Sequence, residues 1–403
     1  MENPFVYGEV VPRSAFVGRE QELHRLASDL GEGQKVFLMS PRRYGKSSLI
    51  RQALAALARR GVLTVDLTVA SYSSYVGFLE GYAEALARAH VARPAGIGAW
   101  VREVLRAVGP EARFVGPGAL ATGASPARAG RAATGAGRTG GQWRSLTFPG
   151  ARTPRDVSRL ADEIFALPQR IADERRGRLV VALDEFQEIA TFDGGSVEQA
   201  LRAAVQHQRQ VGYVFAGSEP ALMERMVGPR RPFYKAGPVM RLQKIPADVF
   251  AAFVETRFRK SGLVPEPGLG DAVVDLAGNL PYDVQRLAHE TWDDVRVASR
   301  RRVTLDDLHQ TLHRLLTEHA VLFEAAWQRL TLGQRAALRA VVVEQGTELL
   351  SGDVRARHRL GGPSSVQAAL AALQRVDLVL RDETGRYAVL DSLFREWIGR
   401  KTY

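Results

Sequence analysis

The segment Ser40-Pro41-Arg42-Arg43-Tyr44-Gly45-Lys46-Ser47-Ser48 lies between an apolar run, Val36–Met39, and a helix predicted to begin near Lys46. A site for a nucleoside triphosphate needs inward-pointing backbone N–H groups, a helix N-terminus, a lysine and a hydroxyl for Mg²⁺. Strand, loop and Gly45-Lys46-Ser47 together meet these needs. Because Ser40 stands where G-x-x-x-x-G-K-[ST] has its first glycine, the match is imperfect. The stretch predicts a phosphate-binding loop, with a plain loop as the alternative.

A second signal is the apolar run Leu179–Leu183, which ends in Asp184 and Glu185. Such a run is typical of a buried parallel strand, whose carboxyl end lies at the edge of the sheet where ligands bind. Asp184 is expected to hold Mg²⁺ together with Ser47, and Glu185 to polarise the attacking water. Adjacent acids after a strand are more often a solvated turn, but the phosphate-binding loop favours the catalytic reading.

Two further candidates follow the predicted strand at 212–216. Ser218 comes directly after this strand and is a candidate sensor of the γ-phosphate, although a helix cap before Pro220 explains it equally well. Arg230 and Arg231 could offer a guanidinium to the γ-phosphate of a neighbouring molecule. Solvated loop charges are the favoured interpretation of these two arginines.

Strands and helices alternate along the first part of the chain, with strands expected at 62–67, 179–183 and 212–216. Helices are expected at about 74–89, at 154–173 and after residue 197. This alternation predicts a parallel sheet with helices on both faces, an α/β class. Residues 246–319 look helical throughout, with Thr304 and Asp307 fitting a capping box. From residue 330 onward, three helices and a β-hairpin indicate a winged helix, whose third helix is started by a Ser364/Gln367 capping pair.

The expected domains are a nucleotide-binding domain at 1–240, a helical lid at 241–325 and a winged helix at 326–403. A low-complexity insertion at about 112–150 interrupts the first domain and is expected to be disordered or poorly packed. This region also carries much of the net charge of +11, because 112–155 has seven arginines and no acidic residue. The arginines are Arg113, Arg128, Arg131, Arg138, Arg144, Arg152 and Arg155. The charge is therefore a weak argument for nucleic-acid binding.

Several classes of protein are disfavoured by composition. The chain has no cysteine, which excludes disulfides, thiolate metal sites and a cysteine nucleophile. Its eight histidines lack ligand spacing, so no structural metal is expected. No apolar run is long enough to span a bilayer and the N-terminus does not look like a signal peptide. A cytoplasmic protein without membrane contact is expected.

The chain resembles the archaeal-type ATPase family, a branch of the STAND class of AAA+ P-loop ATPases. The runs that carry this resemblance are Asn3-Pro4-Phe5, Phe16-Val17-Gly18-Arg19-Glu20, the segment 40–49, Leu183-Asp184-Glu185-Phe186-Gln187 and Gly278-Asn279-Leu280-Pro281-Tyr282. In that family the phosphate-binding loop often lacks its first glycine, as here at Ser40. One departure is Asn279, where the lid motif usually has glycine.

The resemblance implies ATP and Mg²⁺ as cofactors and assigns roles to residues. Phe16, Val17, Gly18 and Arg19 would line the adenine pocket, and Pro281 would mark the lid motif that closes on the nucleotide. Pro41, Arg42, Arg43, Tyr44, Gly45, Lys46, Ser47 and Ser48 would surround the phosphates. Asp184 and Glu185 would form the Walker B pair. Lys46, Asp184 and Glu185 are the expected catalytic residues.

Three functions remain open at this point. The first is an ATP-hydrolysing regulator whose nucleotide state controls the lid and the winged helix, with a protein partner or homo-oligomer as output. The second is a DNA-binding AAA+ protein resembling archaeal origin-recognition factors. Its expected recognition helix, 364–376, presents only Gln367, Gln374 and Arg375, whereas Arg355, Arg357, His358 and Arg359 are better placed for phosphates. The third is a scaffold that binds nucleotide without hydrolysing it.

Overall fold

The computed structural model of the chain describes residues 2–90, 113–115, 145–148, 153–192, 195–382 and 384–401. The chain forms two compact units. The first unit comprises residues 1–20, 41–48 and 243–403, and the second comprises 21–40 and 49–242. The phosphate-binding loop thus groups with the C-terminal part of the chain, although the strand before it belongs to the second unit.

The second unit is built on a five-stranded sheet in the order β2-β5-β6-β1-β7. All of its strand pairs are parallel. The strands are β1 (Lys35–Met39), β2 (Leu63–Thr68), β5 (Leu179–Asp184), β6 (Val211–Gly217) and β7 (Val239–Arg241). All residues of β5 and β6 are buried, which agrees with their continuous apolar sequence. The predicted α/β class is confirmed, and β7 is an edge strand that the sequence pattern did not reveal.

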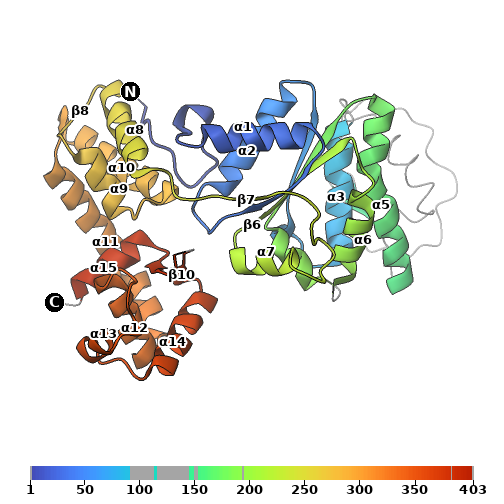
Figure 1. Cartoon of the computed structure of the whole chain (residues 1–403). Helices are drawn as coiled ribbons and strands as arrows, with labels where there is room; N and C mark the ends of the chain where they lie inside the picture. The colour runs from blue at the N-terminus through green and yellow to red at the C-terminus, as the bar shows by residue number, and fades with distance from the viewer. Residues whose placement is uncertain are drawn as a thin grey trace, which may run out of the picture. The chain divides into compact units, whose positions relative to one another are not determined.

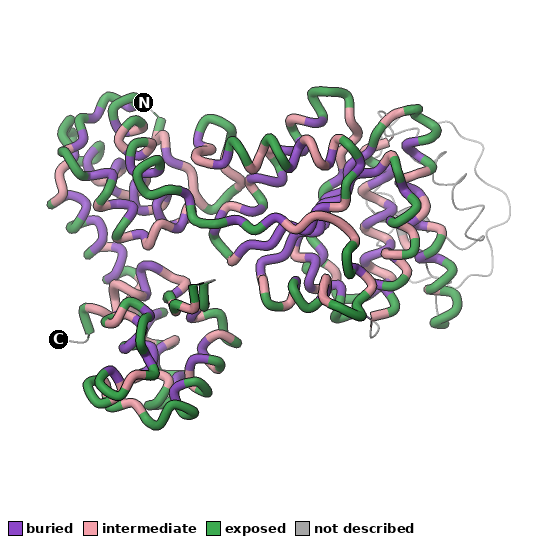
Figure 2. The backbone as a smooth tube through the Cα atoms, viewed as in Figure 1, coloured by how far each residue is buried: buried purple, intermediate pink, exposed green. Residues whose placement is uncertain are grey.

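Helices cover both faces of this sheet (Figure 1). Alternate strand residues such as Phe37, Val181 and Phe215 join one hydrophobic cluster with α3, α5 and α6. The intervening residues, such as Val36 and Leu38, are buried as well and point to the opposite face of the sheet. Figure 2 shows these strands buried along most of their length. The helices are α1 (Glu20–Gly31), α2 (Lys46–Ala58), α3 (Tyr75–His90), α5 (Pro154–Arg175), α6 (Ser196–Val205) and α7 (Pro220–Met226).

In the first unit, four helices form the region predicted as a lid. They are α8 (Ala247–Lys260), α9 (Leu269–Leu276), α10 (Pro281–Val297) and α11 (Leu305–Gln328). The predicted capping box is present: the Thr304 hydroxyl accepts from the backbone N–H of Asp307, and the Asp307 carboxylate accepts in return. The region is not helical throughout, because the two-residue strands β8 (Val264–Pro265) and β9 (Arg302–Val303) pair in parallel.

The C-terminal part of the first unit has the predicted winged-helix order. Three helices, α12 (Leu332–Val343), α13 (Gly352–Arg357) and α14 (Pro363–Arg375), precede the antiparallel strands β10 (Val379–Arg381) and β11 (Tyr387–Val389). A final helix, α15 (Ser392–Lys401), was not predicted. The predicted Ser364/Gln367 cap is wrong, because α14 begins one residue earlier at Pro363 with Gly362 as N-cap and no capping side chain. Proline at the first helical position fixes φ in advance, which explains this start.

Most of the predicted insertion at about 112–150 lies outside the described residues. Within it the structure describes two short strands, β3 (Arg113–Val115) and β4 (Ser145–Thr147), which pair antiparallel. Phe148 follows β4, is buried in the hydrophobic cluster of the second unit and donates its backbone N–H to Glu80 over 2.7 Å. Strands of three residues are too short to leave an alternating sequence signal, so they were not predicted. The domain boundaries at 240 and 325 stay predictions.

Candidate active site

The loop after β1 leads into α2 through two residues in the left-handed region, Arg43 with φ 69° and Gly45 with φ 87°. Ser40 is not among the described residues with positive φ, so no conformational need for glycine exists at this position. Its backbone N–H donates to the carbonyl of Gly217 over 3.2 Å, which fixes the start of the loop against β6. The substitution of glycine by serine is thus compatible with the loop.

Lys46 opens α2 and is buried, whereas Ser47 is exposed. Tyr44 is buried, and its carbonyl accepts from the guanidinium of Arg19 over 3.4 Å. The hydroxyl of Ser48 accepts from the backbone N–H of Val11 over 3.3 Å. The first turn of α2 is therefore joined to the N-terminal segment within the first unit.

The predicted carboxylates follow β5 as expected. Asp184, with a side chain 7% exposed, accepts the backbone N–H of Glu185 at Oδ1 over 2.9 Å. Glu185 adopts φ 52°, which is uncommon for a residue other than glycine. Strain of this kind gathers at functional sites, where the surroundings hold a residue in an unfavourable conformation.

Glu185, Gln187 and Ser218 form a polar cluster at the carboxyl ends of β5 and β6. The amide Nε2 of Gln187 donates to Oε2 of Glu185 over 2.7 Å and to Oγ of Ser218 over 3.4 Å. The Ser218 hydroxyl in turn donates to the same carboxylate oxygen of Glu185. Strands β5 and β6 are neighbours, and Ser218 thereby reaches the carboxylate of Glu185, the residue after Asp184.

Gln187 is the member of this cluster to which the sequence interpretation assigned no role. Its side chain is 4% exposed, and Oε1 has no hydrogen-bond partner among the described residues. Gly217 leaves room for the Gln187 side chain. A Cβ at residue 217 would lie 2.8 Å from Oε1 of Gln187 and 2.3 Å from the Met223 side chain. A polar residue two positions after Glu185, opposite a strand that ends in glycine, is the sequence signal that could have revealed it.

The turn predicted to line the adenine pocket, Phe16 to Arg19, lies in the first unit. Gly18 has φ 64°, and a Cβ there would lie 2.6 Å from Cγ2 of Ile245, so both conformation and space require glycine. Val17 packs against the hydrophobic cluster of this unit. Arg19 is 4% exposed, and its guanidinium donates to the carbonyls of Tyr44 and Gln243. Arg19 thus connects the turn to the phosphate-binding loop.

Asn279 occupies the position where the lid motif usually has glycine, and the structure gives a physical reason why asparagine is accepted. Its φ of 54° lies in the left-handed region, which asparagine tolerates better than most residues. Nδ2 donates to the carbonyl of Ile245 over 2.8 Å. Two residues later Pro281 begins α10 at its first position, with Leu280 as N-cap.

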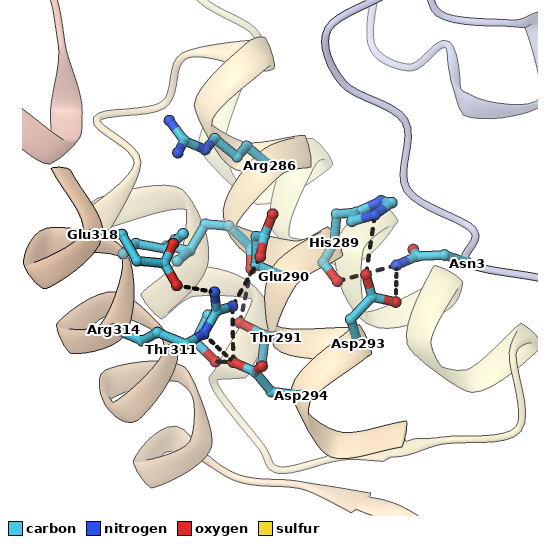
Figure 3. A network of polar contacts seen from close by, with 12 residues as sticks. Asn3, Arg286, His289, Glu290, Thr291, Asp293, Asp294, Thr311, Arg314 and Glu318 are labelled. Atoms are coloured by element: carbon cyan, nitrogen blue, oxygen red, sulfur yellow. Dashed lines mark hydrogen bonds and ion pairs between the residues drawn. The ribbon is translucent and has the colours of Figure 1, made fainter. Parts of the chain in front are cut away.

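Helix α10 is held from two sides (Figure 3). On one side Asn3 donates to the carbonyl of His289 over 3.1 Å and to the carboxylate of Asp293 over 3.0 Å. On the other side Arg314 of α11 pairs with Glu290 over 2.8 Å and with Asp294 over 3.2 Å. The N-terminal run Asn3-Pro4-Phe5 therefore serves to anchor the segment that leads to the turn at residues 16–19.

The family models fit this arrangement. A model described as an AAA ATPase domain matches residues 15–216, half of the 403-residue chain. The chain belongs to the AAA ATPase domain family. A second model, described as a probable winged helix domain, matches residues 321–400. No curated protein matches the chain.

Several solved structures share the fold of this chain at low sequence identity. The Walker-type ATPase PABY2304 of Pyrococcus abyssi is 15% identical, with 97% of this chain and 99% of that chain covered and a TM-score of 0.59. The ORC2 protein of Aeropyrum pernix, in ADPNP–ADP complexes, is 13% identical, with 100% and 97% covered and a TM-score of 0.53. The ORC1 protein of the same organism, in complex with DNA, is 14% identical, with 98% and 96% covered and a TM-score of 0.50.

In this AAA ATPase, Arg231 is bound to a buried carboxylate of α6. Arg231 pairs with Glu198 through Nη2 at 2.7 Å and 3.0 Å, and the Glu198 side chain is only 1% exposed. Burial raises the pKa of Glu198, and the charge and hydrogen bond of Arg231 oppose that rise. Arg231 therefore pairs with a buried carboxylate, although its own side chain is 45% exposed, and Arg230 is exposed as well.

Membership of the AAA ATPase domain family implies nucleotide binding, and the donor types at the site suit Mg²⁺. A serine hydroxyl at Ser47 and a carboxylate at Asp184 are oxygen ligands, which Mg²⁺ prefers. Among the described residues no helix is both long and apolar enough to cross a membrane.

Proposed function

We propose that this AAA ATPase hydrolyses ATP slowly, as a regulator of the STAND kind, and that its nucleotide state controls the lid and the winged helix. The observation that carries the proposal is the cluster at Glu185. Its carboxylate is held by Ser218 and Gln187 at the edge of the sheet where β1 also ends. A carboxylate fixed in this way can orient and polarise a water molecule for attack on a phosphate.

The remaining residues take the roles that the phosphate chemistry requires. Lys46, Gly45 and the backbone N–H groups of 41–48 would bind the phosphates at the N-terminus of α2. Ser47 and Asp184 would hold Mg²⁺, which neutralises charge on the phosphates when bound. Phe16 to Arg19 would contact the adenine. Pro281 would bring the start of α10 to the nucleotide when the lid closes.

An ATPase assay of three proteins tests the proposal. Wild type should release phosphate in a Mg²⁺-dependent reaction, and Lys46→Ala should lose both nucleotide binding and turnover. Glu185→Gln should bind ATP as wild type does but hydrolyse it about 10²-fold more slowly or worse, because a general base is removed. Wild-type binding without any turnover would instead support a scaffold that holds nucleotide without hydrolysing it.

DNA binding through the winged helix is the second candidate, favoured by a basic pocket of about 670 Å³. Arg339, Arg357, His358 and Arg359 line it. Against it, Arg357 and His358 both pair with Glu344 over 2.7 Å, which reduces the charge available to phosphates. A titration of DNA binding against salt decides: a steep dependence that Arg359→Ala weakens supports this function, and no binding at about 100 mM salt removes it. In that case the winged helix would bind a protein partner or a second copy of this chain.

A further inference from the structure

Two adjacent arginines of the phosphate-binding loop form ion pairs with carboxylates of the winged helix. Nη1 of Arg42 lies 3.0 Å from Asp377, which follows α14, and Nη2 of Arg43 lies 3.2 Å from Asp391, which precedes α15. Arg43 also donates to the carbonyl of Leu390 over 3.4 Å. All of these residues belong to the first unit. Arginines in such a loop were expected to face phosphates, whereas these two face carboxylates of the winged helix.

Arg43 has a third acidic neighbour on α10. Nη1 lies 3.6 Å from Oδ1 of Asp283, a side chain only 4% exposed, and the guanidinium lies 5.4 Å from the ring centroid of Tyr282. Oδ2 of Asp283 has no hydrogen-bond partner among the described residues. A buried carboxylate is costly without a counter-charge, and Arg43 is the cation that faces it. One guanidinium therefore joins the phosphate-binding loop, the start of the lid helix and the winged helix.

We infer that Arg42 and Arg43 are positioning residues through which Asp377 and Asp391 of the winged helix restrain the phosphate-binding loop. This inference rests on the proposed function. A triphosphate brings several negative charges to the loop, and these attract the two arginines and repel the nearby carboxylates. Because the arginines cannot pair fully with both sets of anions, nucleotide binding and the contact with the winged helix oppose each other. By linkage, weakening that contact must strengthen ATP binding.

The sign of this effect separates it from a merely structural role. Asp391 also accepts the backbone N–H of Phe394 at Oδ1 over 2.9 Å, so Asp391→Asn can keep this cap while removing the charge. Partly exposed ion pairs contribute modestly, and Asp391→Asn should therefore lower the Kd for ATP about two- to fivefold. Asp377→Asn should act in the same direction but less, because both members of its pair are about half exposed.

The binding experiment uses the full chain and a fluorescent ATP analogue, with Asp353→Asn as the matched control. Asp353 is an exposed carboxylate of α13, so its removal changes the charge of the winged helix equally. Tighter binding by Asp391→Asn, with binding by Asp353→Asn unchanged from wild type, supports the inference. Equal or weaker binding by a folded Asp391→Asn protein, with Lys46-dependent binding in wild type, overturns it and leaves the proposed function standing. Wild-type binding that does not depend on Lys46 would overturn both.

A second measurement tests the contact without nucleotide. Because the chain has no cysteine, Arg42→Cys/Asp377→Cys places the only two thiols at the contact. A short bismaleimide should link them much faster than in the control Arg42→Cys/Asp353→Cys. Equal rates would show that the contact does not form in solution and would overturn the inference, whatever the ATPase assay gives.

Discussion

The side-chain amide of Gln187 donates a 2.7 Å hydrogen bond to the carboxylate of Glu185 from a position that is only 4% exposed. Glu185 itself is in the left-handed region, with φ 52°. A hydrogen bond to a charged group is worth about 1.5–3 kcal/mol, enough to keep the carboxylate in one orientation. If Glu185 polarises water, Gln187 helps to set the direction from which that water attacks the phosphate.

Gln187→Leu should lower kcat for ATP hydrolysis about tenfold or more while leaving KM close to the wild-type value, because the amide acts on Glu185 and not on the nucleotide. Steady-state kinetics measures both constants. Ser218→Ala is the informative companion: a sensor of the γ-phosphate would change ATP affinity, whereas a partner of Glu185 would change kcat. An unchanged kcat in Gln187→Leu would contradict the role given to Gln187.

Asp283 should make stability depend on pH. Burial raises its pKa to about 6 from a usual 3.8, with the charge of Arg43 opposing the rise. Between these values the folded state binds more protons than the unfolded state, so this contribution is fully present below about pH 4 and is lost as pH rises through about 6. As the pH rises through this range, the unfolding free energy of wild type should therefore fall by up to about 3 kcal/mol relative to that of Asp283→Asn.

Urea unfolding of both proteins at about pH 4.5 and about pH 7.5 should show about 2 kcal/mol of this shift, because part of it lies below pH 4.5. Asp271→Asn, which removes an exposed carboxylate from the neighbouring helix α9, is the control. A difference that stays constant across this range would show that Asp283 titrates normally.

Asn279 should tolerate glycine better than alanine. Asn279→Ala loses the hydrogen bond to the Ile245 carbonyl and places a Cβ-bearing residue without local polar compensation at φ 54°, at a cost of about 1–2 kcal/mol. Asn279→Gly loses the same hydrogen bond but relieves the backbone, so it should cost less. Urea unfolding gives the order of stability. If the alanine and glycine variants were equally stable, the left-handed backbone would not be the reason for asparagine.

Arg231→Ala should destabilise the fold by about 2–4 kcal/mol, because it leaves Glu198 buried without its cation. Arg230→Ala should change stability by less than about 0.5 kcal/mol, as is usual for an exposed position. Thermal unfolding of the two variants measures the contrast. Arg231→Ala/Glu198→Gln should recover part of the loss. A role as an arginine finger would appear differently, as lost turnover in a protein of normal stability.

Short stretches of sequence determined the framework of this protein. Interactions between neighbours in the chain determine each of these features. They are the apolar runs at β1, β5 and β6, the Gly45-Lys46-Ser47 turn and the Thr304/Asp307 cap. Periodicity and capping therefore predicted the parallel sheet, the phosphate-binding loop and most helices without reference to distant residues. Strands of two or three residues, such as β3, β4 and β7, have no periodicity to detect and were missed.

Only the tertiary structure decided which polar groups meet. Arg43 pairs with Asp283 and Asp391, Glu185 with Ser218, and Glu198 with Arg231, and every one of these partners is far away in sequence. Ion pairs and hydrogen bonds depend on distances of a few ångströms and on burial, which packing sets and local sequence does not. For this reason the sequence predicted the candidate catalytic residues, and the folded chain revealed what holds them.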